Sequence, residues 1–288
     1  MRMTAVAGVL AVLAAGTAGG APPAPSPGAV TGGALVGAAH GTGTLPPAHA
    51  VNGSGPAGRA PGDGAGASDA GAGGVGGPPR GWFVAVREVD PSVREDMRYA
   101  GARNFTGAVV DGYAEPVCLL TRPAAEALRR AQRRLLPRGY TLRVYDCYRP
   151  QRAVDRFVRW AREPDGPADL AAKAAHYPRV DRARLIPEGY IAEKSGHSRG
   201  STLDVTLEHL SGRAVDMGTP FDFFDPRSHT DDPGAADTVR ANRRLLRGVL
   251  AEQGFVNLPE EWWHFTHRPE AFPSTFFDFP VSVASLRP

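Results

Sequence analysis

The sequence predicts an α+β fold: a single domain with a small, mainly antiparallel sheet flanked by helices and preceded by a disordered leader. Helical and strand patterns alternate without a regular βαβ period, and no internal repeat is visible. All 23 aromatic residues (4 Trp, 7 Tyr and 12 Phe) follow residue 80, so residues 81–288 remain to build one hydrophobic core. This division excludes a two-domain protein.

The leader, residues 19–80, has a composition that cannot form a core. It contains 19 Gly, 14 Ala and 10 Pro, only four charged residues and no aromatic side chain. Such a segment buries too little apolar surface to offset the entropy lost on ordering. We therefore expect residues 19–80 to be disordered.

The first 18 residues resemble an export signal. Arg2 precedes an apolar run, residues 4–15, that is too short to span a bilayer, and small residues follow at 16–18. We therefore expect residues 1–18 to be a signal peptide, the mature protein to be exported, and no membrane span to remain. The alternative is a start codon assigned too far upstream, which would leave the protein in the cytoplasm.

The first half of the domain shows two strand–helix pairs. Residues 82–86 form a short apolar run typical of a strand. Residues 123–136 place alanine and leucine on one helical face and arginine on the other. Residues 140–146 alternate as a strand, and Pro150 opens a helix that reaches about residue 162.

The second half predicts three further elements. Residues 202–207 alternate so that Asp204 shares one face of a strand with Thr206. Asp232 followed by proline predicts an N-cap for a helix that extends to about Gln253. Residues 261–266 are rich in aromatic and β-branched side chains and predict the last strand.

Charge and cysteine content narrow the function classes. The net charge of +3 is too small to indicate a nucleic-acid partner, and the basic residues lie scattered among acidic ones. Cys118 and Cys147 are the two cysteines in the chain. If the protein is exported, they are expected to form a disulfide, although two buried free thiols remain the alternative.

Three residues have the composition of a catalytic zinc site. His197, Asp204 and His264 supply two imidazoles and one carboxylate, which leaves a fourth position for water. Glu261 precedes His264 by three residues and could accept the proton of that water. On an ideal strand these two would face opposite sides, so the hypothesis requires a strand end or a bulge there. Another divalent metal would suit the same ligands.

A competing motif overlaps this segment. Residues 196–200 match G-x-S-x-G, the nucleophile elbow of serine hydrolases, with Ser198 followed in order by Asp222 and His264. The elbow should follow a buried strand and open a helix, whereas here a strand pattern comes after it. The context therefore argues against a serine hydrolase.

Five segments carry a family resemblance: residues 104–113, 144–154, 195–207, 217–225 and 261–265. They resemble, in order, segments of the D-alanyl-D-alanine dipeptidases, the VanX-like branch of the zinc D,D-peptidases of family M15. The resemblance implies an α+β zinc hydrolase that splits D-Ala-D-Ala into two D-alanines. It implies His197, Asp204 and His264 as zinc ligands, Glu261 as general base and Arg149 as the cation that stabilises the oxyanion.

The same resemblance implies how a zwitterionic dipeptide is held. Ser195 and Tyr113 would meet its carboxylate, and Tyr99 with Asp222 its ammonium group. An exported enzyme of this kind would act in wall-peptide turnover or salvage of the dipeptide. Two alternatives stay open: a D,D-carboxypeptidase or endopeptidase acting on longer wall peptides, and a non-catalytic wall-binding module.

Overall fold

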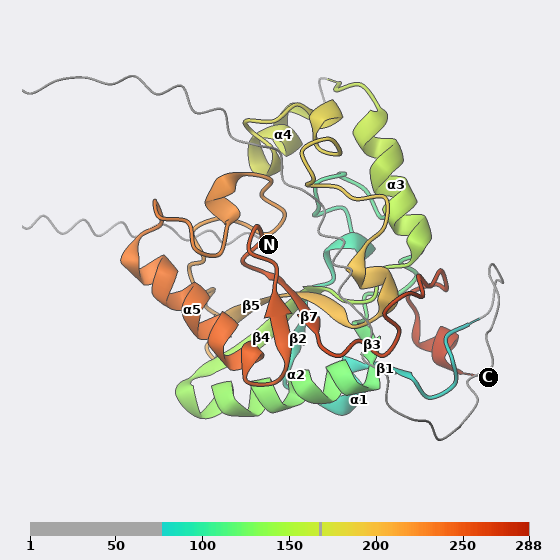
Figure 1. The fold of residues 1–288 in the computed structure, drawn as a ribbon, viewed down its shortest axis with the longest axis vertical. Coiled ribbons are helices and arrows are strands. Elements are labelled where there is room, and N and C mark those ends of the chain that lie inside the picture. Colours follow the sequence, from blue (N-terminus) through green and yellow to red (C-terminus); the bar gives the residue numbers. More distant parts are fainter. Residues whose placement is uncertain (1–76, 167–168, 288) are drawn as a thin grey trace, which may run out of the picture. The chain divides into compact units, whose positions relative to one another are not determined.

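A computed structural model describes residues 77–166 and 169–287 of the chain (Figure 1). The expected signal peptide, residues 1–18, lies outside the described residues. So does the expected leader, residues 19–80, except for its last four positions. Among the described helices, none combines the length and apolar character needed to cross a membrane.

A five-stranded sheet forms the centre of the domain. Its spatial order is β2-β4-β5-β7-β6, and only the pairing of β2 with β4 is parallel. The strands are β2 (Arg94–Glu95), β4 (Tyr140–Asp146), β5 (Thr202–His209), β6 (Phe255–Asn257) and β7 (His264–His267). A separate antiparallel pair joins β1 (Phe83–Ala85) to β3 (Leu119–Thr121). The expected small, mainly antiparallel sheet is thus confirmed.

Helices flank the sheet. They are α1 (Val86–Val89), α2 (Arg122–Leu135), α3 (Gln151–Arg162), α4 (Leu170–His176) and α5 (Asp237–Ala251). Helix α2 packs against β4 and α5, and α5 packs against β5, so these two helices lie together beside the sheet. Figure 1 shows α3 and α4 on the other side of the domain.

Most predicted elements are confirmed, but one helix start is wrong. Helix α5 begins at Asp237, four residues after the expected start at Pro233. The carboxylate of Asp232 instead accepts a hydrogen bond from the backbone N–H of Gly234 at 3.0 Å, which closes a turn. The helix ends as expected before Gly254, whose φ of 87° suits glycine.

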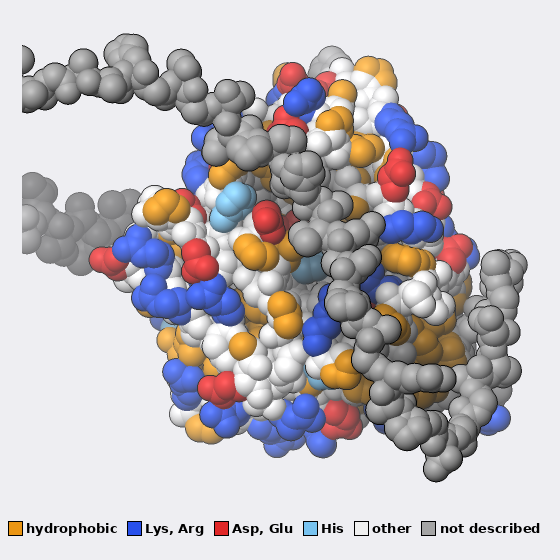
Figure 2. All heavy atoms as spheres, viewed as in Figure 1, with side chains coloured by type: hydrophobic (Ala, Val, Ile, Leu, Met, Phe, Trp, Pro, Cys, Tyr) orange, Lys and Arg blue, Asp and Glu red, His pale blue; other side chains and the backbone are white. Residues whose placement is uncertain are grey.

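The amphipathic pattern of α2 explains which of its faces is buried and why its exposed face is charged. Its alanines and leucines are buried against the sheet, while three of its arginines pair with nearby carboxylates. Arg129 contacts Glu126 at 2.8 Å, and Arg134 contacts Glu252 at 2.7 Å. Figure 2 shows basic and acidic side chains interspersed over α2 and α5.

The two cysteines form the expected disulfide. Cys118 directly precedes β3 and Cys147 directly follows β4, with their Cα atoms 5.3 Å apart. Both side chains are fully buried. The bond therefore links the small sheet to the central one at the end of β4.

Candidate metal centre and active site

Three adjacent strands of the central sheet place acidic and imidazole side chains in a row. Asp146 on β4 is the cross-strand partner of Asp204 on β5, and Asp204 is in turn the partner of His264 on β7. Directly paired residues project their side chains to the same face of a sheet. A register shift between Val144 and Asp146 marks a bulge in β4, a feature often found beside active sites.

His197 reaches this row from a tight turn. Residues 196–199 form a 3₁₀ turn whose N-cap, Ser195, accepts the backbone N–H of His197 at 3.3 Å. Gly200 ends the turn with a φ of 79°, and a Cβ at this position would lie 2.3 Å from the ring of Phe83. Only glycine fits there, and the turn then enters β5.

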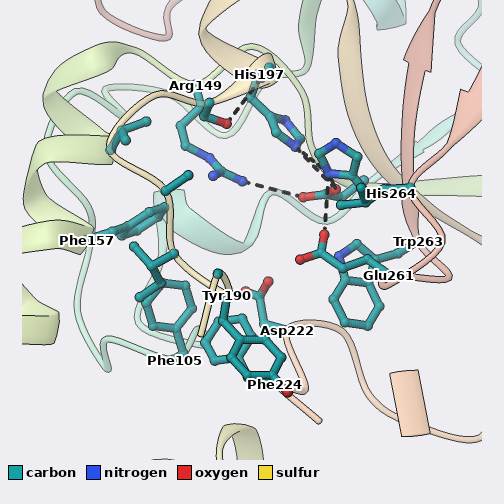
Figure 3. Close-up of a pocket in the computed structure, with 18 of the residues that line it drawn as sticks. Phe105, Arg149, Phe157, Tyr190, His197, Asp222, Phe224, Glu261, Trp263 and His264 are labelled. Atoms are coloured by element: carbon teal, nitrogen blue, oxygen red, sulfur yellow. Dashed lines mark hydrogen bonds and ion pairs between the residues drawn. The ribbon is translucent and has the colours of Figure 1, made fainter. Parts of the chain in front are cut away.

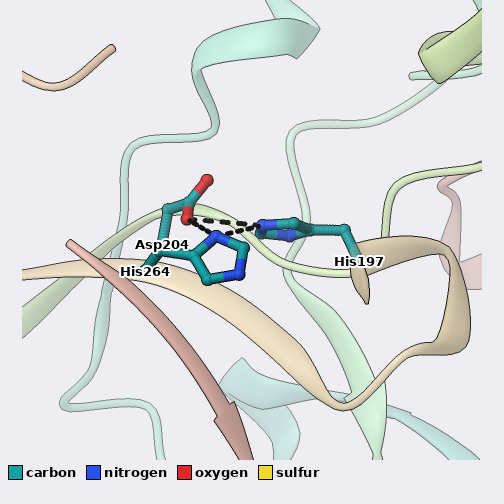
Figure 4. A group of neighbouring side chains, drawn as sticks. All are labelled: His197, Asp204 and His264. Atoms are coloured by element: carbon teal, nitrogen blue, oxygen red, sulfur yellow. Dashed lines mark hydrogen bonds and ion pairs between the residues drawn. The ribbon is translucent and has the colours of Figure 1, made fainter. Parts of the chain in front are cut away.

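The three predicted ligands converge (Figure 4). The Nε2 atom of His197 lies 3.3 Å from Oδ1 of Asp204, and Nδ1 of His264 lies 3.2 Å from each of these atoms. Ligand atoms bound about 2.0–2.1 Å from one tetrahedral ion are about 3.3 Å apart. The spacing therefore fits a single zinc ion.

The chemistry of Asp204 also fits a cation. Its carboxylate is buried, and Oδ1 accepts no hydrogen bond from any residue that the structure describes. An unpaired carboxylate oxygen that faces two imidazole nitrogens is a ready metal ligand.

The ring of His197 is oriented from behind. Its Nδ1–H donates to the backbone carbonyl of Cys147 at 2.8 Å, which leaves Nε2 as the free acceptor facing Asp204. Metal-binding histidines usually donate their second ring N–H in this way. Asp146 Oδ2 lies 3.4 Å from the same Nδ1 and adds negative charge behind the ring.

Glu261 lies beside the metal ligands. It does so because Glu261 precedes the strand and so need not face away from His264, as it would on an ideal strand. Strand β7 begins only at His264, while Glu261 occupies the turn before it. The side-chain amide of Asn257 fastens this turn by donating to the carbonyls of Glu261 and His264, each at 3.0 Å. Glu261 Oε2 thereby lies 3.5 Å from Nδ1 of His264, and burial raises the pKa of Glu261 to about 7.

Arg149 is held as a fixed cation at the other side of the ligands. Its Nε donates to Asp146 at 2.8 Å, and Nη2 lies 3.6 Å from Asp204 Oδ2. The guanidinium also lies over the rings of Tyr99 and Phe157, 5.1 Å from each centroid. Burial disfavours the charge, but Asp146 outweighs it, so the pKa of Arg149 lies well above its ordinary value.

These groups open into one cavity of about 220 Å³ (Figure 3). The metal ligands, Glu261 and Arg149 form its polar side. Aromatic side chains form the opposite wall: Phe105, Phe157, Tyr190 and Phe224. Because pockets for drug-sized ligands measure about 300–1,000 Å³, this cavity suits a smaller molecule.

Asp222 and Tyr99 lie together on the cavity wall. The Tyr99 hydroxyl donates to Asp222 Oδ2 at 2.8 Å. Asp222 has a φ of 56° and is the only non-glycine residue with positive φ in the part of the chain that the structure describes. Burial and the nearby charge of Asp204 raise the pKa of Asp222 well above its ordinary value. A cation bound here would restore the charge of this carboxylate.

The other two substrate-binding candidates, Ser195 and Tyr113, differ in their access to the cavity. Ser195 lines the cavity, whereas Tyr113 is not among the lining residues. The hydroxyl of Tyr113 donates to Asp146 Oδ1 at 2.6 Å, beneath Arg149. Its contact with the site therefore runs through Asp146.

Sequence reasoning missed Asp146 and the aromatic wall. Asp146 is fully buried and contacts His197, Arg149 and Tyr113. An available signal was an acid at the end of a strand, three residues before the candidate Arg149. The aromatic residues gave no such signal, because isolated aromatics in a sequence are more often core.

The serine-hydrolase alternative finds no support in this geometry. Ser198 is fully buried, and a strand, β5, follows its turn where a nucleophile elbow would open a helix.

Comparison with known proteins identifies the family of the chain. The family model described as D-Ala-D-Ala dipeptidase, peptidase M15, matches residues 81–282. Relatives named D-alanyl-D-alanine dipeptidase from Streptomyces coelicolor and Enterococcus faecalis are each 45% identical over 201 residues, covering 69% of this chain and 98% of theirs.

A solved structure of a vancomycin-resistance D,D-pentapeptidase VanY mutant with Zn(II) is also similar. It has a TM-score of 0.33 at 13% identity and covers 55% of this chain and 77% of its own. The expected zinc cofactor is supported by the family and by the ligand set His197, Asp204 and His264. The chain belongs to the peptidase M15 family of D-Ala-D-Ala dipeptidases and is a hydrolase.

Proposed function

We propose that this enzyme hydrolyses the free dipeptide D-Ala-D-Ala to two D-alanines in a zinc-dependent reaction. The observation that carries the proposal is the opening of the ligand set, Glu261 and Arg149 into one small cavity. The names of its 45% identical relatives support this substrate.

Zinc bound by His197, Asp204 and His264 would polarise the scissile carbonyl and activate a water molecule. Glu261 accepts the proton of the attacking water and passes it to the leaving amine, as its place beside His264 allows. Arg149, fixed by Asp146, stabilises the negative charge that develops on the carbonyl oxygen. Both side chains are preorganised, so little reorganisation opposes the reaction.

The cavity also explains selection for a dipeptide. Asp222, held by Tyr99, binds the substrate ammonium, and Ser195 lies on the side of the cavity near His197 to meet the carboxylate. Tyr113 serves the carboxylate side indirectly, through Asp146 and Arg149. A longer or N-blocked peptide would leave Asp222 unpaired and would not fit the small cavity.

The N-terminal segment and the disulfide support a proposal for the biological setting. Residues 1–18 have the pattern of an export signal, and disulfides persist in oxidising compartments. We therefore propose that the enzyme acts outside the cytoplasm, where it salvages D-Ala-D-Ala. N-terminal sequencing of the mature protein tests this: a secreted form that lacks the signal is expected, and a cytoplasmic form that retains Met1 would contradict export.

Zinc content and dipeptide hydrolysis of the purified full-length protein test the activity. We expect one zinc ion per chain and release of D-alanine, with hydrolysis reduced about 10²–10⁴-fold by Glu261→Ala. A wild-type protein that binds zinc but releases no D-alanine would exclude the dipeptidase function. Undiminished hydrolysis by Glu261→Ala would exclude Glu261 as the base.

A substrate comparison separates the dipeptidase from a carboxypeptidase. D-Ala-D-Ala and an N-acylated tripeptide that ends in D-Ala-D-Ala are assayed side by side. The free dipeptide should be strongly preferred, because only it offers an ammonium group to Asp222. Equal turnover of both would show that the enzyme acts on longer peptides.

A further inference from the structure

The Cys118–Cys147 disulfide lies directly behind the metal ligands. We propose that this bond is a positioning element of the active site: it holds the Cys147 carbonyl that orients His197 toward the metal. The inference rests on the proposed metal site and adds a residue pair that takes part in no step of the reaction.

The first step is the contact itself. The Cys147 carbonyl accepts Nδ1–H of His197 at 2.8 Å and so determines which ring nitrogen is free to bind metal. Backbone carbonyls behind metal-binding histidines set both the tautomer and the direction of the ring. A carbonyl that shifts or swings away would leave His197 free to rotate or to change tautomer.

The neighbours of Cys147 serve the site as well. Asp146, one residue before it, accepts Nε of Arg149 at 2.8 Å and the hydroxyl of Tyr113 at 2.6 Å. The backbone N–H of Arg149 donates to the carbonyl of His197 at 3.3 Å. Residues 146–149 are thus one support segment that holds a metal ligand and the catalytic cation together.

The support segment has few regular ties of its own. Asp146 is the last residue of β4 and pairs with Asp204 beyond the bulge, whereas residues 147–149 lie between β4 and α3, outside the pairing of the central sheet. Strand β3 belongs to the other sheet and reaches this segment through one backbone bond, from Tyr148 N–H to Leu119 O at 2.9 Å. The disulfide adds a covalent tie at the adjoining residues, between fully buried side chains.

The segment is anchored on the far side of the disulfide too. The carbonyl of Cys118 accepts the backbone N–H of Val86 at 2.9 Å, which fastens Cys118 to the β1–α1 junction. Through the disulfide, the backbone hydrogen bonds of the small sheet therefore restrict the movement of the Cys147 carbonyl. Without the bond, we expect the fold to persist while zinc affinity falls about 10–100-fold, as for loss of other outer partners of metal ligands.

The test compares the oxidised full-length protein with the double variant Cys118→Ala/Cys147→Ala. Replacing both cysteines avoids a free thiol beside the metal. Zinc dissociation constants are measured by competition with a chelator, and the nitrogen chemical shifts of His197 report its tautomer. Melting temperatures are recorded in parallel.

A control variant separates positioning from simple loss of stability. Leu135→Ala creates a cavity at a fully buried position at the far end of α2, about 20 Å along the helix from β3. We expect Leu135→Ala to lower the melting temperature and leave the zinc constant within twofold. The double variant should lower both the melting temperature and the zinc affinity, and should show mixed tautomers of His197.

The outcomes distinguish this inference from the proposed function. A wild-type protein that binds no zinc contradicts the proposed function itself. A wild-type protein and a double variant that bind zinc equally well overturn the positioning role, and the disulfide then only stabilises the fold.

If the double variant does not fold, the zinc-loaded wild-type protein is reduced with a phosphine. Zinc release is followed with a chromogenic chelator alongside far-UV circular dichroism. Zinc release before the loss of helical signal supports the proposal. Zinc that stays bound once the disulfide is reduced, with the helical signal intact, overturns it.

Discussion

Two buried carboxylates on the same strand have opposite surroundings. Asp204 and Glu208 lie four residues apart on β5, point to the same side by strand alternation, and are each 2% exposed. Glu208 is paired with Arg94 and Arg143, one arginine for each carboxylate oxygen. Asp204 has no such pairing: Oδ1 accepts no hydrogen bond among the described residues, and Arg149 lies 3.6 Å from Oδ2.

This difference shows how one sheet supports both a structural and a reactive acid. A buried carboxylate whose charge is neutralised by cationic side chains of the protein needs no bound metal ion. A buried carboxylate that faces two imidazole nitrogens, with one oxygen that accepts no hydrogen bond among the described residues, can take a cation from outside. The two carboxylates are equally buried and lie on the same strand. They differ in whether arginines of the protein neutralise their charge, as they do for Glu208 and not for Asp204.

Asp204→Asn should have the largest effect, because it removes the charge that needs the cation. We expect zinc to be lost on dialysis and kcat to fall by about a thousandfold or more, since metal polarisation supplies several kcal/mol of transition-state stabilisation. Zinc content and D-alanine release check this. Retention of both would show that Asp204 is not a ligand.

Arg149→Ala removes the guanidinium near Asp204 without removing a ligand. We expect kcat to fall about 10²–10³-fold, as for loss of other groups that stabilise a developing oxyanion. The zinc dissociation constant should change by less than about tenfold. Steady-state kinetics with zinc competition check this, and a change in KM alone would limit Arg149 to substrate binding.

Glu208→Gln tests the carboxylate that is paired with two arginines. It should lower the free energy of unfolding by about 2 kcal/mol, because two charge-assisted contacts weaken while Arg94 and Arg143 regain water at their exposed sides. The kcat/KM value should stay within twofold. Denaturant unfolding and the dipeptide assay measure the two effects, and a large loss of activity at normal stability would contradict the comparison.

A third buried carboxylate extends the comparison to pH. Burial disfavours ionisation of Asp225, but Arg227 and Arg179 outweigh it and lower its pKa. A lowered folded-state pKa contributes stability that is present above the unfolded-state value, about 4, and is lost as pH falls through the folded-state value.

Asp225→Asn should therefore cost about 1 kcal/mol at pH 7, a small amount because both arginines are exposed. The difference between wild type and variant should shrink below pH 4. Unfolding free energies from pH 7 to pH 2 measure it, and a difference that does not depend on pH would exclude an ionic contribution.

Local patterns predict the longer elements well and short-range boundaries poorly. Helix α2 and strand β4 are recognisable because burial on one side imposes a regular period on their side chains. The start of α5 is misplaced because Asp232 caps a turn with the same chemistry that caps a helix. The two-residue strand β2 is too short to carry any period.

In the candidate site, too, the sequence predicts some features and not others. The residue types of His197, Asp204, His264 and Glu261, together with the family resemblance of the segments that contain them, are sufficient to indicate metal chemistry. The position of Glu261, in contrast, depends on Asn257, whose amide fastens the turn before β7. Asn257 lies only four and seven residues from these two carbonyls, but such side-chain-to-backbone bonds follow no residue periodicity that the sequence would reveal.

The chain alone therefore specified the ligand types, the cysteine pair and the division at residue 80, because composition and local spacing carry that information. The folded domain decided which groups meet: Asp146 beneath Arg149, the Cys147 carbonyl behind His197, and an aromatic wall opposite the metal ligands. Cys147 and His197 lie 50 residues apart in the sequence, and the aromatic wall combines residues from Phe105 to Phe224. Sheet register and packing set such distances, and neither can be read from a local stretch of sequence.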